Sequence, residues 1–131
     1  MKKLARELPL EILIAEDNFI NQKLMLDILA MHGYTCDAAA SGFETLEVVK
    51  KKKYDLILMD IQMPGMSGEE TMLSVHELLG KNSPKIIAVT AYAMAGDRDK
   101  YISAGMDGYL SKPFRVNELM GEIVRVMKEE E

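Results

Sequence analysis

The chain has 131 residues, enough for one domain that buries a core without disulfide or metal staples. Apolar residues make up 48% and charged residues 28%, which excludes a disordered tail and a fibrous repeat. The 16 basic and 21 acidic side chains give a net charge of −5, which argues against nucleic acid or an anionic membrane as the main partner. The single cysteine, Cys36, cannot form an internal disulfide.

Hydropathy predicts a chain that does not insert into a membrane. The longest run without a charged side chain covers residues 86–96, about half of what a membrane span requires. The basic start is interrupted by Glu7, Pro9 and Glu11 and does not match a signal peptide. We therefore expect a cytoplasmic protein.

Apolar runs alternate with segments of helical period along the whole chain. The predicted strands cover residues 11–15, 34–38, 56–59, 86–90 and 108–110. The predicted helices cover residues 18–33, 41–53, 67–79, 97–104 and 115–128, with a capping box formed by Ser41 and Glu44. This alternation predicts an α/β fold, a doubly wound five-stranded parallel sheet with five helices. Residues 1–8 are an extension or linker, residues 9–128 the folded domain and residues 129–131 an acidic tail.

Polar side chains follow four of these strands. They are Glu16 and Asp17 after the first, Asp60 after the third, Thr90 after the fourth, and Lys112 with Pro113 after the fifth. Because the carboxyl ends of parallel strands share one edge of the sheet, these groups are expected to converge there.

The chemistry of this set points to a metal and a phosphoryl group. Three carboxylates in close contact repel one another unless a cation is present, and oxygen ligands favour Mg²⁺. Asp60 stands alone at the end of the central strand and is the natural nucleophile for an aspartyl phosphate, with Lys112 and Thr90 placed for the phosphoryl oxygens. Glu16 and Asp17 are adjacent and suited to hold the metal.

Each residue also has an ordinary structural explanation. The acidic pair before Asn18 is compatible with a helix cap, and Asp60 precedes a turn that contains Pro64. Thr90 is common in strands, and a single lysine is usually solvated. Only their joint placement at one sheet edge favours a site.

Four ordered motifs carry a resemblance to a known family. The stretches ILIAEDN, YDLILMDIQMPGMSG, IIAVTA and GYLSKPF resemble the receiver domain of two-component response regulators, over residues 10–128. The resemblance implies the strand order 2-1-3-4-5 of flavodoxin-like folds, for which a receiver protein is itself a standard example.

The resemblance also implies the roles of the site residues. Asp60 accepts a phosphoryl group from a phosphohistidine of a histidine kinase or a histidine phosphotransfer domain. Mg²⁺, or Mn²⁺ in its place, is held by Glu16, Asp17, Asp60 and the backbone carbonyl of Gln62. Glu16 stands where the family more often has aspartate, which changes its reach without abolishing the site.

The same resemblance implies a switch. Thr90 and Lys112 contact the phosphoryl oxygens, Thr90 moves toward them, and Tyr109 rotates inward. Asn21 and Gln22 after EDN, together with GDR before the last motif, resemble receiver modules of hybrid histidine kinases and phosphorelays more than those joined to DNA-binding domains. The expected protein is a signalling phospho-acceptor, which catalyses only its own phosphotransfer and slow autodephosphorylation.

The residues at the expected site are less compatible with three other functions. A metal-dependent phosphohydrolase needs a general acid two residues after the nucleophile, where Gln62 stands. A flavin or nucleotide protein needs a glycine-rich phosphate loop after the first strand, where EDNFINQ stands. A degenerate receiver would lack one of the site residues.

Two features suggest how a partner docks and how long the signal lasts. The first predicted helix carries apolar residues on two sides. Leu24 lies on the arc that is expected to face the core. Phe19 and Ile20, which are near the site, form a candidate docking surface. The resemblance to receiver domains also implies that Gln62 and Tyr92, two residues after Asp60 and Thr90, border the path of the water that hydrolyses the acyl phosphate. Neither is an acid or base near neutral pH, which predicts slow hydrolysis.

Overall fold

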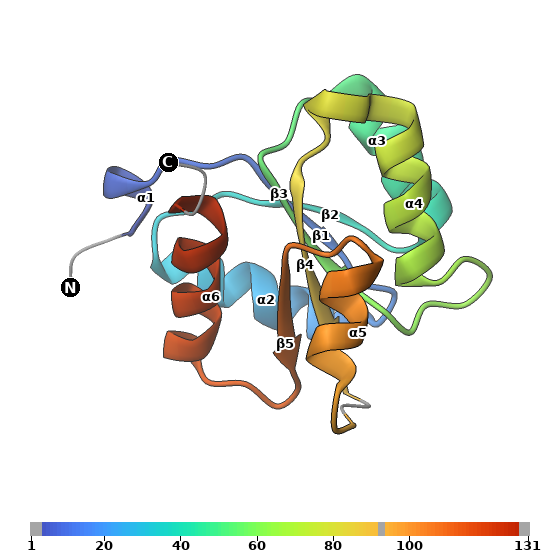
Figure 1. Ribbon diagram of the computed structural model, residues 1–131. Coiled ribbons are helices and arrows are strands. Elements are labelled where there is room, and N and C mark those ends of the chain that lie inside the picture. The colour runs from blue at the N-terminus through green and yellow to red at the C-terminus, as the bar shows by residue number, and fades with distance from the viewer. Residues whose placement is uncertain (1–3, 92–93, 129–131) are drawn as a thin grey trace.

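The computed structural model describes residues 4–91 and 94–128 and has a central sheet of five parallel strands (Figure 1). The strands are β1 (Ile12–Ala15), β2 (Asp37–Ala39), β3 (Leu56–Asp60), β4 (Lys85–Thr90) and β5 (Gly108–Ser111). Their order is β2-β1-β3-β4-β5, and every neighbouring pair is parallel. The predicted fold class and strand order are confirmed.

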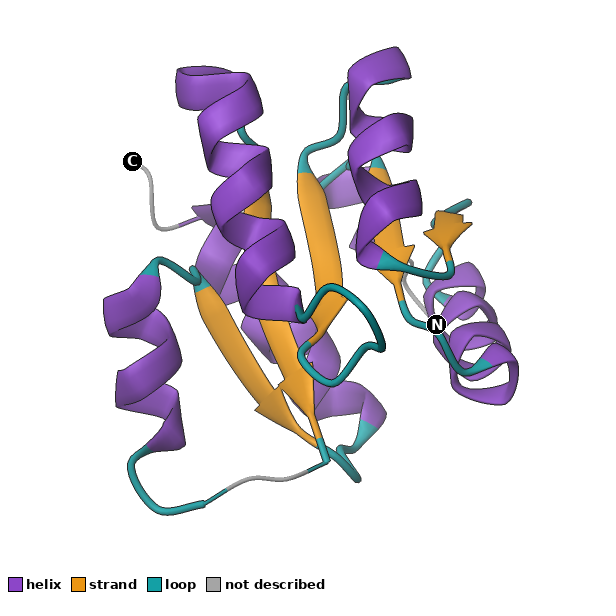
Figure 2. Cartoon of the chain, turned by 90° about the vertical axis from the view of Figure 1, so that its right-hand side faces the viewer, coloured by secondary structure: helices purple, strands orange, loops and turns teal. Residues whose placement is uncertain are grey.

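Helices cover both faces of the sheet (Figures 1 and 2). They are α1 (Leu4–Glu7), α2 (Phe19–Met31), α3 (Gly42–Lys51), α4 (Gly68–Leu79), α5 (Asp97–Ala104) and α6 (Val116–Lys128), with a 3-10 turn η1 (Gly80–Asn82) after α4. Side chains of α2 and α6 pack in one core cluster with Ile12, Ile14, Leu56 and Leu58. Those of α3, α4 and α5 pack in a second cluster on the other face. The five predicted helices correspond to α2–α6, and α1 is additional.

Side chains cap the helices that lead away from the site. Asn18 Oδ1 accepts from the amide of Asn21 at the start of α2. Ser67 and Glu70 form a complete capping box at α4. The box predicted for α3 is only half present, because the Glu44 carboxylate accepts from the amide of Ala40, one residue before the Ser41 cap.

The second strand is shorter and starts later than predicted. Tyr34 precedes β2, where its ring is buried and its hydroxyl donates to the carbonyl of Leu8 at 2.6 Å. The apolar character of residues 34–36 thus reflects packing around the N-terminal segment instead of strand pairing. Cys36 lies in this loop and is half-buried, so its expected place inside a strand was wrong. Burial, followed by the charges of Asp37 and Glu11, raises the pKa of its thiol to about 12.

Helix α1 also packs on the domain. Leu4 and Ala5 contact the cluster formed by α2 and α6, and the Ala5 amide donates to the carbonyl of His32 at 3.0 Å. Among the described helices, none is long and apolar enough to cross a membrane.

A close backbone approach fixes the loop after β3. The amide of Gly68, the first residue of α4, donates to the carbonyl of Ile61, and a Cβ at Gly68 would lie 2.5 Å from the backbone oxygen of Asp60. Only glycine fits there without a shift of the backbone. The N-terminus of α4 is therefore held directly against the end of β3.

Candidate functional site

Three carboxylates meet at the carboxyl edge of the sheet, as predicted. Glu16 and Asp17 follow β1, and Asp60 is the last residue of β3. One oxygen from each lies within 4.8 Å of the other two. Glu16 is 4% and Asp60 6% exposed, whereas Asp17 is open to solvent. The site thus combines two buried carboxylates with one that is exposed to solvent.

Both carboxylate oxygens of Glu16 are engaged by protein donors. Lys112 Nζ contacts Oε1 at 2.8 Å, and the amide of Asn18 donates to Oε2 at 3.1 Å. The side-chain amide of Gln22 donates to the Glu16 carbonyl at 3.1 Å and fixes the backbone behind it. Asn18 and Gln22 were not expected to support the site.

The pairing of Lys112 with Glu16 joins residues 96 positions apart. Both residues are expected at the same sheet edge from the sequence, but a contact between them is not, because Lys112 is expected to contact phosphoryl oxygens. In the structure its ammonium has the Glu16 carboxylate as a partner instead.

Asp60 is an unusual carboxyl group. Burial, and then the charge of Glu16, raise its pKa to about 7, against the opposing effects of Lys112 and the amide of Gln62. That amide donates to Asp60 Oδ1 at 3.2 Å. A buried carboxylate that is this costly to ionise gains most from a nearby cation.

The donor set fits a hard divalent cation. The three carboxylates carry −3 when ionised and Lys112 carries +1, so the site has a surplus of negative charge that a divalent ion neutralises. All the side-chain ligand atoms are oxygens, and Asp17 is exposed to water, which suits Mg²⁺ because it keeps part of its hydration shell. Within residues 4–91 and 94–128, no other group of three metal-ligating side chains is found.

Thr90 is the last residue of β4, and Lys112 directly follows the neighbouring strand β5. Thr90 is buried, and its carbonyl accepts from the amide of Lys112 at 2.7 Å. The bond between Lys112 and Pro113 is cis. The structure therefore brings the ends of these two strands to the same edge as the carboxylates.

The remaining predicted residues surround this edge. Tyr109 is half-buried on β5, with its ring stacked on Tyr101 of α5 at a centroid distance of 5.9 Å. Gln62 is exposed. Phe19 and Ile20 are 74% and 77% exposed at the start of α2. Tyr92 lies outside the described residues.

An apolar groove runs beside the site. It has a volume of about 510 Å³ and lies between α2 and the segment that follows β5. Its lining consists of Asn21, Leu24, Met25, Ile28, Ala91, Lys112, Pro113 and Phe114. Leu24 is 57% exposed, so the expectation that it faces the core was wrong. The charged end of Lys112 connects the groove with the carboxylates.

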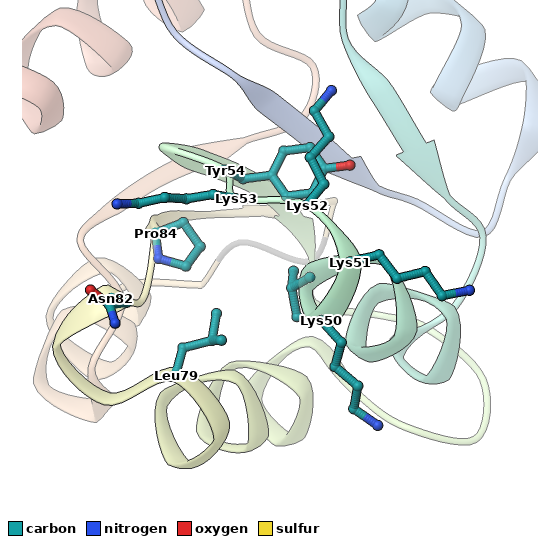
Figure 3. Close-up of a pocket in the computed structure, with 9 residues that line it drawn as sticks. Lys50, Lys51, Lys52, Lys53, Tyr54, Leu79, Asn82 and Pro84 are labelled. Carbon is teal, nitrogen blue, oxygen red and sulfur yellow. The ribbon is translucent and has the colours of Figure 1, made fainter.

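A second hollow lies at the opposite end of the sheet (Figure 3). It has a volume of about 320 Å³ and is lined by Lys50–Lys53 together with Val49, Tyr54, Leu79, Asn82 and Pro84. Figure 3 shows the four ammonium groups pointing away from one another. Lys52 is already paired with Asp37 at 2.8 Å and Glu11 at 3.1 Å. These lysines do not converge on one ligand.

The fold and the acidic edge define a class of signalling domain, and comparison with known proteins identifies it. Residues 12–124 match the response regulator receiver domain family, and the chain belongs to that family.

Relatives are receiver modules of larger proteins and one small regulator. The chain is 43% identical over 122 residues to hybrid signal transduction histidine kinase G of Dictyostelium discoideum, and 38% identical over 122 residues to the histidine-protein kinase BarA of Escherichia coli. These alignments cover 90% and 91% of the chain but only 4% and 13% of the two relatives. The polar-differentiation response regulator DivK of Brucella anthropi is 38% identical over 109 residues, which cover 83% of the chain and 89% of that protein.

A solved structure shows a related site with a metal. The receiver domain of sensor histidine kinase PA1611 from Pseudomonas aeruginosa, which has a magnesium ion coordinated in its active-site cleft, superposes with a TM-score of 0.81 at 34% identity. The match covers 91% of this chain and 98% of that one. The chain is thus a receiver domain of the kind found in two-component and phosphorelay systems.

Proposed function

We propose that the protein takes a phosphoryl group from a phosphohistidine onto Asp60 in a reaction that requires Mg²⁺. The observation that carries this proposal is the buried Asp60 carboxyl at the end of the central strand, in contact range of two further carboxylates. The magnesium in the related receiver of Pseudomonas aeruginosa supports the same conclusion.

The transfer exchanges one bond to phosphorus for another. An Asp60 carboxylate oxygen forms a bond to phosphorus as the bond between phosphorus and the imidazole nitrogen of the donor breaks. When bound, Mg²⁺ supplies positive charge for the phosphoryl oxygens, with Glu16, Asp17, Asp60 and the Gln62 carbonyl around it. Mn²⁺ offers the same charge and oxygen preference.

Lys112 and Thr90 complete the site. The Lys112 ammonium exchanges its contact with Glu16 for a phosphoryl oxygen, and the Thr90 hydroxyl donates to another. Thr90 then draws its loop toward the site and Tyr109 turns inward, which changes the surface formed by β5 and its neighbours. Pro113 follows Lys112 and shapes the segment that carries it.

The partners in this proposal are proteins. A histidine kinase or a histidine phosphotransfer domain supplies the phosphoryl group, and nucleic acid and membrane insertion have no part. The protein is a cytoplasmic signalling phospho-acceptor, which acts on no external substrate beyond its phosphodonor. Residues 1–8 remain a predicted extension, residues 9–128 the receiver and residues 129–131 a tail.

Labelling with acetyl phosphate tests the proposal. We expect one phosphoryl group per chain, seen by intact-mass spectrometry, in the presence of Mg²⁺ or Mn²⁺ and none with EDTA. Asp60→Asn abolishes the adduct. Asp55→Asn, a change at an exposed aspartate just before β3, leaves it intact. A normal yield of base-labile adduct on Asp60→Asn would refute the assignment.

A further inference from the structure

The outer edge of β5 is closed by side chains. This strand is at the end of the sheet and pairs only with β4. The amide of Tyr109 donates to Glu122 Oε2 of α6 at 2.8 Å, and the Tyr109 carbonyl accepts from Arg98 of α5 at 3.4 Å. Backbone groups that an edge strand usually leaves open are therefore both engaged.

The two capping side chains are also paired with each other. Arg98 contacts Glu122 Oε2 at 3.2 Å, and Arg125 contacts both oxygens of the same carboxylate at 3.0 Å and 2.9 Å. The Glu122 side chain is only 10% exposed. We call Arg98, Tyr109, Glu122 and Arg125 the edge clamp.

The absence of a side chain at Gly108 leaves room for the Glu122 carboxylate of the clamp. A Cβ at Gly108 would lie 2.8 Å from Glu122 Oε2, so a larger residue there would push the carboxylate away from the neighbouring amide of Tyr109. Arg125 also donates to the carbonyl of Asp107 at 3.2 Å. Three consecutive residues, 107–109, thus accommodate the two α6 side chains.

Helix α5 is attached to β5 through this clamp and through one aromatic side chain. Of its described side chains only Tyr101 is buried, and that ring stacks on Tyr109. Arg98 holds the first turn of α5 to the backbone of Tyr109 and to Glu122. The hydrogen bond from Arg98 and the stacking of Tyr101 therefore both involve Tyr109 of β5.

Tyr109 of the clamp lies on β5, the strand directly before Lys112, and Arg98 lies on α5, the helix that follows β4 and Thr90 in the chain. The contact between Arg98 and the Tyr109 carbonyl, at 3.4 Å, is the longest bond of the clamp. The contacts of the clamp are therefore expected to change when the site at the sheet edge changes.

We propose that Glu122 is a positioning residue, which, with Arg98, holds α5 against β5 in the unphosphorylated protein and is released when Asp60 is phosphorylated. The release on phosphorylation rests on the proposed function, whereas the holding of α5 against β5 does not. Loss of the clamp shifts the population toward the released arrangement before any phosphorylation.

Amide hydrogen exchange measured by NMR on the unphosphorylated protein tests the first half. Glu122→Ala should speed exchange at Tyr109 at least about tenfold, because its amide loses its acceptor. Glu122→Gln should have a smaller effect at Tyr109, since its carbonyl still accepts, but should speed exchange in α5 as Arg98→Ala does. Glu118→Gln, an exposed carboxylate of the same helix, is the control. Unchanged exchange at Tyr109 in a folded Glu122→Ala protein would overturn the clamp.

The rate of labelling by acetyl phosphate tests the second half. We expect labelling of Arg98→Ala to be about fivefold faster than that of the parent, the effect of removing one net hydrogen bond from the resting state. An unchanged or slower rate, with fast exchange in α5, would reduce the clamp to a purely structural feature. If the parent itself takes no label at Asp60, the proposed function fails while the exchange experiment still decides on the clamp.

Discussion

Glu16 has one methylene group more than an aspartate, and its carboxylate is bound differently from that of Asp17. The longer side chain brings its two oxygens to Lys112 and to the amide of Asn18 at once. The carboxylate of Asp17 is open to solvent. The protein therefore satisfies Glu16 internally and leaves Asp17 and Asp60 as the carboxylates with most to gain from a cation.

The raised pKa of Asp60 predicts how stability varies with pH when metal is absent. The folded protein keeps this proton up to about pH 7, whereas the unfolded chain releases it near pH 4. Between these values the folded state binds more protons, so its free energy of unfolding falls as the pH rises. Urea unfolding in EDTA at several pH values should show this decline in the parent and a flatter profile in Asp60→Asn. Identical profiles would contradict the shift.

The sequence around the acceptor predicts a long-lived phosphorylated state. Gln62 and Tyr92 are the residues expected to border the attacking water, and neither can deprotonate it near neutral pH. Tyr92→Glu or Tyr92→Ala should therefore speed the loss of phosphoryl label, measured with Mg²⁺ by intact-mass spectrometry. Loss within seconds in the parent, or no acceleration in either variant, would show that the lifetime is set elsewhere.

At the scale of elements, α2 is the helix with the most apolar surface left open near the site. Phe19 and Ile20 are exposed at its start, and the apolar groove along it reaches Lys112. A helical bundle that carries the phosphohistidine would cover this surface and bring its imidazole to Asp60. We expect Phe19→Ala to slow transfer from such a bundle while labelling by acetyl phosphate stays unchanged.

A matched control separates docking from folding in that experiment. Phe43 is likewise exposed at the start of a helix but belongs to α3, on the other face of the sheet. Phe43→Ala should leave both reactions unchanged. Equal transfer rates for Phe19→Ala and the parent would exclude Phe19 from the docking surface.

Strands with an almost continuous apolar sequence could be predicted from the sequence alone. Residues in β3 and β4 are apolar almost throughout because helices cover both faces of the sheet, and the polar residues at their ends, Asp60 and Thr90, mark the site edge. Parallel strands then bring these residues together whatever the details of packing. The composition of the site therefore followed from the order of the strands.

Elements that depend on distant contacts were not predictable. Nothing local distinguishes Tyr34 in a loop from Tyr34 in a strand, because its place is set by Leu8, 26 residues away. Helix α1 is too short to form alone and exists through packing of Leu4 and Ala5. The bond between Glu16 and Lys112 likewise depends on rotamers that no spacing rule specifies.

The three carboxylates of the site and the run of four lysines lie at opposite ends of the sheet. The carboxylates gather where β1 and β3 end, and the run of Lys50–Lys53 lies at the other end of the sheet. Electrostatic repulsion among the three carboxylates opposes folding, and the burial of Glu16 and Asp60 strengthens this repulsion. A cation at that edge removes this repulsion only in the folded state, since the unfolded chain separates the three carboxylates.

Magnesium should therefore stabilise the entire domain. At a free Mg²⁺ concentration of about 100 times its Kd, measured beforehand by calorimetric titration, the free energy of unfolding in urea should rise by about 2.7 kcal/mol relative to EDTA. Asp17→Asn should remove most of this gain, because Asp17 offers the cation an open carboxylate. Glu16→Gln should remove less, because both oxygens of Glu16 already have donors within the protein. A larger loss in Glu16→Gln than in Asp17→Asn would show that the ion displaces Lys112 from Glu16 and binds there directly.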